Sequence, residues 1–178
     1  MSMKFEINIG NYRWKMSSIL KKIVDVEGTY SLCSDGKHVV YLDYDMLDSE
    51  ALRIEVKNLQ RQYRLGTFYI FESSTGNHHA ICLDKVTPEV YELIISSSNC
   101  DPSFKKYNRF NRMASRVLRM SPKADKNVNY LYKLDNRSDR IKSLPHADFL
   151  EKVYGIEKDS GGYDNSSKLY VCRYQTPI

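Results

Sequence analysis

The order of periodic segments between residues 39 and 123 is the feature that most constrains the fold. From Ser49 to Leu65, apolar residues recur at steps of three and four among charged ones, which predicts an amphipathic helix. A second helix is expected from Pro88, because Thr87 is a good N-cap and proline fits the first helical position. β-branched, aromatic or apolar runs predict strands at 39–45, 67–71, 78–83 and 115–120. The order is therefore strand, helix, strand, strand, helix, strand.

This order is the split β-α-β unit of ferredoxin-like folds, which RNA-recognition modules and polymerase palms share. We therefore expect an α+β fold, with an RRM-like β-α-β-β-α-β core at about residues 39–123. Both helices should cover one face of an antiparallel sheet and leave the other face open. The 178 residues should form a single domain, with 1–38 and 124–178 packed on the core as extensions. In these extensions we expect strands at 4–9, 29–33 and 169–174, a basic helix at 16–26 and a short helix at 147–154.

Composition excludes several classes of protein. Apolar residues make up 42% of the chain and charged residues 28%, as in an ordinary globular protein. No apolar run approaches the roughly 20 residues that a membrane-spanning helix needs, and the N-terminus does not resemble a secretion signal. We therefore expect an intracellular, cytoplasmic protein with no membrane partner. The four cysteines are scattered without a CxxC pair, so we expect free thiols and no zinc.

Two acids follow the first strand of the core. The apolar run 39–42 leads into Asp43, and Asp45 stands two residues further on. Because side chains alternate along a strand, both carboxylates should project from one face of the sheet, the one away from the helices. Two neighbouring carboxylates repel each other unless a cation lies between them. The pair therefore indicates a site for Mg²⁺ or Mn²⁺, and the alternative is a strand that runs out into an acidic loop.

A polar turn and two histidines form the second feature. The turn at 73–77 contains Gly76 and leads into His78 and His79 at the start of a strand. A glycine-bearing turn lets backbone amides approach a ligand, and a histidine beside it can donate to a phosphate oxygen. Adjacent strand residues point to opposite faces, so only one histidine should face the acids. We expect it to be His79, and the alternative is an ordinary surface turn.

A basic block follows the second helix. Between residues 105 and 126, eight cations stand against one acid, and Tyr107 and Phe110 lie among them. Such a segment suits a phosphate backbone, with rings available for base stacking, although it could also be a solvated face. The cations are Lys105, Lys106, Arg109, Arg112, Arg116, Arg119, Lys123 and Lys126.

Together these motifs resemble those of archaeo-eukaryotic primases, a family that includes the primase-polymerases of plasmids, viruses and repair systems. The family pattern is DxD, then a small residue, any residue and His, then a hydrophobic residue followed by an acid. Here the corresponding runs are 41–45, 76–79 and Cys100-Asp101, and the basic run 116–123 resembles the family's nucleotide-contacting strand. Asn77 stands where the family often has serine, and the missing cysteine cluster implies a minimal member without a zinc module.

The resemblance implies a template-directed nucleotidyltransferase, a DNA primase or polymerase, that uses two Mg²⁺ or Mn²⁺ ions. One ion would activate a 3′-hydroxyl and the other would hold the incoming triphosphate. The implied partners are a template and primer, nucleoside triphosphates and, as a further possibility, a helicase. The implied metal ligands are Asp43, Asp45 and Asp101; the nucleotide-binding residues are Asn77, His79, Arg119, Ser121 and Lys123; the residues that hold the nucleic acid are Lys105, Lys106, Arg109 and Arg112.

Three alternatives remain open at this point. A non-catalytic RRM-like module would bind single-stranded nucleic acid through Tyr41, Tyr44, Phe68 and Phe71. A rolling-circle replication nickase would share the fold, but it spaces its metal-binding histidines with one residue between them. A phosphohydrolase with a DxD metal site would leave the basic block unexplained. Asp101 also precedes Pro102, so it could cap a turn instead of binding metal.

Overall fold

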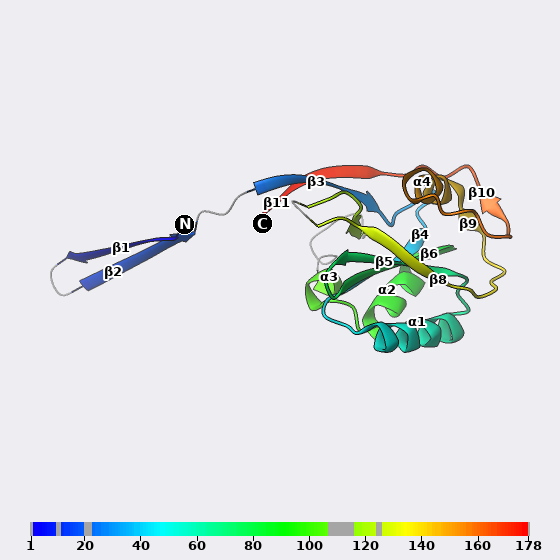
Figure 1. Cartoon of the computed structure of the whole chain (residues 1–178), viewed down its shortest axis with the longest axis horizontal. Helices are drawn as coiled ribbons and strands as arrows, with labels where there is room; N and C mark the ends of the chain where they lie inside the picture. The colour runs from blue at the N-terminus through cyan, green and yellow to red at the C-terminus, as the bar shows by residue number, and fades with distance from the viewer. Residues whose placement is uncertain (1, 10–11, 20–22, 107–115, 124–125, 178) are drawn as a thin grey trace.

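The computed structural model describes residues 2–9, 12–19, 23–106, 116–123 and 126–177 and has an α+β architecture (Figure 1). The helices are α1 (Ser49–Tyr63), α2 (Pro88–Ser97), α3 (Pro102–Lys106) and α4 (Leu144–Tyr154). The strands are β1 (Ser2–Ile9), β2 (Tyr12–Ile19), β3 (Ile23–Tyr30), β4 (His38–Tyr44), β5 (Phe68–Ser74), β6 (Asn77–Val86), β7 (Val117–Arg119), β8 (Asn129–Leu134), β9 (Lys142–Ser143), β10 (Tyr163–Asp164) and β11 (Val171–Pro177).

The strands form a main sheet, a small sheet and a hairpin. The main sheet has the order β10-β9-β6-β5-β8, and β4 pairs with β6. Both β4 and β5 run antiparallel to β6. The small sheet has the order β11-β3-β7 and is antiparallel throughout. The β1–β2 hairpin extends away from the other elements in Figure 1. The elements of the expected core thus follow each other as predicted, but β7 pairs with β3 and not with the main sheet.

Local sequence explains the two long helices. Asp48 caps α1, since its carboxylate accepts from the backbone N–H groups of Glu50 and Ala51 at 2.9 and 3.1 Å. The helix ends at Arg64, which adopts a left-handed conformation with φ of 52°. The expected Thr87 cap of α2 is present, with proline in the first turn. The apolar side of α1 is buried against the main sheet through Leu52, Val56 and Leu59.

Both faces of the main sheet are covered. In Figure 1, α1 and α2 lie below the sheet, and α4 lies above it with the small sheet. Tyr41 packs edge-on against His146 of α4, and Phe71 packs against Tyr154 of the same helix. Both rings are at most 2% exposed. The expectation of an open sheet face is therefore wrong here, because the segments after residue 124 supply a helix that buries it.

The predicted helix at 16–26 is also wrong. Its first residues belong to β2, and its last residues belong to β3, where Ile23, Val24 and Val26 favour an extended backbone. The strand is stabilised by pairing with β11 and β7, which no local pattern reveals. The other predicted elements of the two ends overlap observed ones, namely β1, the end of β3, α4 and β11.

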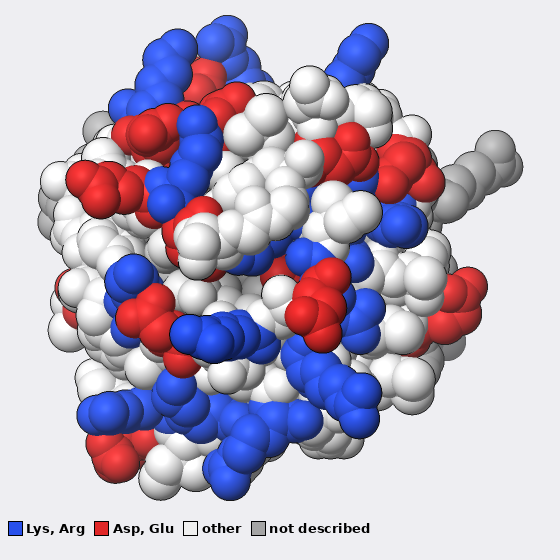
Figure 2. All heavy atoms as spheres, turned by 90° about the vertical axis from the view of Figure 1, so that its right-hand side faces the viewer, with Lys and Arg blue, Asp and Glu red and all other residues white. Residues whose placement is uncertain are grey.

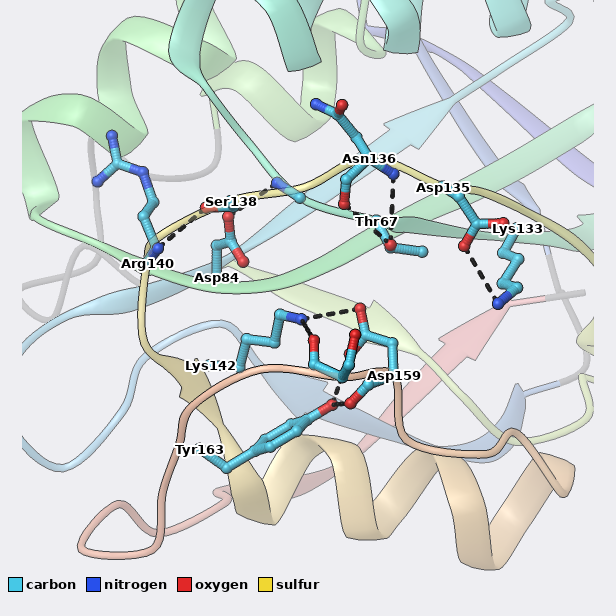
Figure 3. A network of polar contacts seen from close by, with 12 residues as sticks. Thr67, Asp84, Lys133, Asp135, Asn136, Ser138, Arg140, Lys142, Asp159 and Tyr163 are labelled. Carbon is cyan, nitrogen blue, oxygen red and sulfur yellow. Dashed lines mark hydrogen bonds and ion pairs between the residues drawn. The ribbon is translucent and has the colours of Figure 1, made fainter.

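Polar contacts connect the start of β5 and the end of β6 with the segments 134–142 and 159–163 (Figure 3). Lys142 donates to the carboxylate of Asp159 at 2.8 Å, and the hydroxyl of Tyr163 donates to the same carboxylate at 2.6 Å. Asp84 is fully buried and accepts from the N–H of Gly66 at 2.8 Å. Because these acids receive hydrogen bonds from the chain itself, the network holds the fold together.

Two expectations drawn from composition concern cysteines and membrane spans. All four cysteines are free thiols as predicted, and Cys82 is buried in β6. In the described part of the chain, none of the helices combines the length and the apolar character that crossing a membrane requires.

Candidate active site

A cleft of about 370 Å³ lies where the main sheet meets the small sheet. One wall is formed by the ends of β4 and β6 and by the turn after β5. The other wall is formed by β7, β11 and the segment that follows β7. The residues that line the cleft are Asp43, Asp45, Ser73, Ser74, Asn77, His79, Val117, Arg119, Lys123, Lys126 and Tyr174.

The paired acids lie at the mouth of this cleft. Burial, together with the neighbouring carboxylates of Asp45 and Asp101, raises the pKa of Asp43 to about 7. The pKa of Asp45 is also raised, by burial and by Asp101. The guanidinium of Arg119 acts in the opposite direction on Asp43 but does not offset these effects. Burial and mutual repulsion therefore disfavour the ionised forms of both carboxyl groups.

Asp101 has the capping role that was the alternative to its expected role as a metal ligand. Its carboxylate Oδ2 accepts from the N–H of Phe104 at 2.8 Å, so it caps the start of α3. Its own N–H donates to the carbonyl of Asp43 at 2.8 Å, which brings it beside the end of β4. It does not line the cleft but lines an adjoining pocket, to which Asp43 also contributes. The acid thus contributes to the local negative charge while it holds α3 in place.

His79 lies directly opposite Asp43 in the pairing of β4 with β6. Its Nε2 is 3.5 Å from Oδ1 of Asp43, and its Nδ1 is buried without a hydrogen-bond partner among the described residues. Burial, Arg119 and His78 lower the pKa of His79 to about 3, so the imidazole is neutral at neutral pH. His78 lies opposite Tyr44 and points to the other face of the sheet.

The cationic side of the cleft is built around Arg119. Its Nη1 donates to the carbonyl of Ser121 at 2.7 Å and to that of Lys126 at 3.3 Å, and its Nη2 donates to the carbonyl of Ser73. These bonds span the cleft from β7 to the end of β5 and fix the guanidinium near the acids. Lys123 and Lys126 line the cleft beside it. Three cations thus line the same cleft as the two acids.

Asn77 and Ser121 were both predicted to bind nucleotide, but only Asn77 lines the cleft. Asn77 lines the cleft, and its side-chain oxygen accepts from the N–H of Met46 at 3.2 Å. Ser121 does not line the cleft, because its hydroxyl accepts from the N–H of Glu27 at 2.7 Å on the small sheet.

The basic block divides into residues with different roles. Arg116 is 1% exposed and pairs with Glu92 at 2.8 Å, over the ring of Tyr91, so it belongs to the core. Lys105 donates to the carbonyl of Ser98, and Lys106 is exposed on α3. Arg109 and Arg112 lie outside the described residues. Within the part of the block that the structure describes, the cations therefore do not share one binding surface.

Cations also lie along α1. Arg53, Lys57 and Arg61 recur at steps of four, which places them along one side of the helix, and the exposed Arg64 follows as its C-cap. Figure 2 shows Lys and Arg gathered along the lower edge of the molecule, where α1 lies, while Asp and Glu are mixed with them elsewhere on this face. Lys57 donates to the carbonyl of Asp135 at 3.1 Å, so part of this charge is used within the fold.

Acids at the two ends of the main sheet differ in how their charge is balanced. Asp159, at the end opposite the cleft, is partly buried, but hydrogen bonds from Lys142 and Tyr163 lower its pKa (Figure 3). Asp43 and Asp45 instead have raised pKa values beside each other. Among the described residues, no group of three or more His, Cys, Asp or Glu side chains is already arranged to hold a metal ion. The pair at the cleft offers two carboxylates, whose oxygens are hard ligands.

The wall formed by the small sheet was missed by sequence reasoning. Tyr30, Val117, Cys172 and Tyr174 line the cleft or its adjoining pocket. They share one face of the small sheet, as their strand register shows. Alternation within residues 171–174 was the only local pattern that could have indicated it.

Comparison with known proteins gave no further guide: no family model, no curated protein and no solved structure matched this chain.

Proposed function

We propose that this cleft is the active site of a template-directed nucleotidyltransferase of the primase-polymerase type. One observation carries the proposal: Asp43 and Asp45, with raised pKa values, share a single cleft with Arg119, Lys123 and Lys126. Phosphoryl transfer needs both a carboxylate site for divalent cations and cations that bind the triphosphate. A cleft with only one of these charges would suit a simple metal site or a simple anion site.

The strand pairing supports an RRM-like core in part. In such a core the first and third strands are neighbours and the second strand flanks the third. The corresponding strands β4, β6 and β5 pair in that way. The fourth strand, β7, instead joins the small sheet and brings Arg119 to the cleft from the opposite side. The proposal therefore combines an RRM-like half with a wall from the terminal segments.

The acids fit Mg²⁺ or Mn²⁺. Their oxygens are the ligands that these hard cations prefer, and a bound cation would remove the repulsion that raises the pKa of Asp43. Asp43 and Asp45 would hold the cation, with Asp101 as a candidate third ligand. The bound ion would lower the pKa of the attacking 3′-hydroxyl and neutralise charge on the phosphates.

The other residues of the cleft have roles that follow from their charge. Arg119, Lys123 and Lys126 bind the phosphates and stabilise the pyrophosphate that leaves. His79 is neutral, so it donates one N–H without adding charge beside Asp43. The 3′-oxygen of the growing strand attacks the α-phosphorus, the bond to pyrophosphate breaks, and the hydroxyl proton passes to solvent. Lys105 and Lys106 remain candidates for holding the template.

Two alternatives are less well supported. A module that reads bases with Tyr41 and Phe71 needs exposed rings, and both are buried under α4. A rolling-circle nickase needs two histidines that face one metal, whereas His78 and His79 point to opposite faces of the sheet.

The test is a strand-extension assay with primed and unprimed templates, nucleoside triphosphates and Mg²⁺ or Mn²⁺. We expect product with the parent protein and its loss in Asp43→Asn and Asp45→Asn. A second readout is thermal stability: Mg²⁺ should raise the melting temperature of the parent and leave the double variant unchanged. Absence of product under all these conditions, or equal synthesis by the acid variants, would refute the proposal.

A further inference from the structure

A second pocket, of about 530 Å³, adjoins the cleft. The two share Asp43, Val117 and Tyr174, so the second pocket begins where the first ends. Its remaining lining residues come from β3, α3, β11 and the segments next to them. They are Tyr30, Asp101, Ser103, Phe104, Arg116, Cys172 and Arg173.

The two pockets differ in chemistry. The cleft has three cations that line it, and the second pocket is walled mainly by aromatic and apolar side chains. The two cations of the second pocket are paired within the chain, Arg116 with Glu92 at 2.8 Å and Arg173 with Glu27 at 2.6 Å. Its other charged residues are the acids Asp43 and Asp101. The second pocket is therefore unsuited to phosphate and suited to a flat, neutral group.

The ring of Tyr174 is held at the boundary by the small sheet. Gly28 lies at the centre of this sheet, and its neighbours on the same face are Val117 and Tyr174. A Cβ atom at Gly28 would lie 3.3 Å from the Tyr174 ring and 2.6 Å from Cγ1 of Val117. The ring thus packs directly on the glycine backbone, which stiffens it as a stacking surface. The side chain remains 38% exposed, so part of it is available to a ligand.

We propose that the second pocket binds the base and sugar of the incoming nucleotide, with the ring of Tyr174 stacked on the base. The inference rests on the proposed function, because it places the triphosphate of the same molecule in the cleft. The reacting phosphate then lies at the shared boundary, beside Asp43. Base stacking on a tyrosine tolerates all four bases, so the pocket selects a nucleotide as a class and leaves the choice of base to the template.

The test compares two ligands, a nucleoside triphosphate and inorganic triphosphate, by calorimetry with Mg²⁺ and without template. The parent should bind the nucleoside triphosphate about 10-fold more tightly, as expected for one stacked base. In Tyr174→Ala this preference should disappear, while the affinity for inorganic triphosphate stays within about 2-fold. Tyr174→Phe should keep the preference, because it keeps the ring.

Two further variants separate stacking from folding. Tyr170→Ala is the matched control, because Tyr170 is also 38% exposed and lines neither pocket; it should keep the preference. Tyr174→Leu keeps apolar bulk on Gly28 without an aromatic face and should lose most of the preference even if the alanine variant is unstable.

The outcomes distinguish this inference from the function on which it rests. Equal affinity of the parent for both ligands, or equal weakening of both by Tyr174→Ala and Tyr174→Leu, overturns the inference alone. Binding with the expected preference but without synthesis overturns the proposed function and leaves the nucleotide pocket standing. If the parent binds neither ligand, both are overturned.

Discussion

The two walls of the cleft are built in different ways. The wall from the main sheet carries Asp43 and His79 on the paired strands β4 and β6, which are separated in the sequence by α1 and β5. The wall from the small sheet carries Arg119 and Tyr174 on strands that meet only through β3. One wall is acidic and lies within the predicted core, whereas the other is cationic and aromatic and joins β7 to strands at 23–30 and 171–177. The acidic and the cationic groups of one cleft are thus positioned by different kinds of pairing.

The largest expected effect comes from the acidic wall. Asp43→Asn should lower the rate of strand extension at least about 100-fold, because it removes a carboxylate from the site of charge development. Steady-state extension kinetics measure this effect. The affinity for nucleotide should change far less, since the wall from the small sheet remains intact.

Asp139→Asn is the matched control, because Asp139 is an exposed acid far from the cleft. Its rate should stay within about 2-fold of the parent. A similar loss in both variants would show that net charge, and not the acid pair, determines the rate.

The small sheet should be sensitive to a single methyl group. Gly28→Ala would place a Cβ 2.6 Å from Cγ1 of Val117 and 2.7 Å from the carbonyl oxygen of Leu118. Because a backbone atom cannot move aside freely, we expect a loss of about 1–3 kcal/mol in the free energy of unfolding. Urea denaturation measures this loss.

Gly162→Ala is the control for this change, because no atom lies within 4 Å of the new methyl group. Its stability should stay within about 0.5 kcal/mol of the parent. Equal stability of the two variants would mean that the strands of the small sheet do not pack as closely as described.

His146 connects α4 with the small sheet, and we expect it to make the stability of the fold depend on pH. Its Nε2 donates to the carbonyl of Tyr30 at 3.0 Å, and its Nδ1 accepts from the hydroxyl of Ser143 at 2.7 Å. Burial lowers the pKa of His146 from 6.5 to about 4. The unfolded chain therefore binds a proton first as the pH falls from 6.5 to 4, and the folded state loses stability over that window.

Denaturation at several pH values in the parent and His146→Gln checks this prediction. Between pH 6.5 and 4 the parent should lose on the order of 2 kcal/mol more than the variant. His38 and His79 also have lowered pKa values, but they titrate in both proteins. Parallel curves for the two proteins would contradict a neutral, buried His146.

The smallest expected effect concerns Lys126, an exposed cation that lines the cleft. Lys126→Met should raise the KM for nucleotide about 3-fold at low salt, and the difference should shrink at high salt because exposed charges are screened. Lys152→Met is the control, since Lys152 is exposed on α4 away from the cleft. An effect of Lys126→Met that does not depend on salt would indicate a structural role instead.

The same contrast explains what could be predicted from the sequence. The acid pair, the histidine turn and the helices α1 and α2 follow from patterns within a few residues, and the structure has them at the expected positions. The helix expected at 16–26 failed because β3 is extended through its pairing with β11 and β7, which local spacing does not encode. The prediction of an open sheet face failed for the same reason, because the packing of α4 on that face is a contact between distant segments.

Among the residues predicted to form a site, those with one local role lie together. Asp43, Asp45 and His79 line one cleft, and Asp43 and His79 face each other across the pairing of β4 with β6. Arg116 could not be separated from Arg119 by sequence, because only the packing against Tyr91 and Glu92 reveals that its charge is internal. Tyr174 had no motif around it, since its role depends on a glycine in another strand.

The position of Gly28 beside Cys172 also has a consequence for the timing of folding. The thiol of Cys172 donates to the carbonyl of Gly28 across a separation of 144 residues. During synthesis the strands of the acidic wall emerge and can pair long before β11 exists, whereas closing so long a loop is slow and entropically costly. A nascent chain would therefore form its acidic wall early, whereas its aromatic wall could form only after β11 has been synthesised.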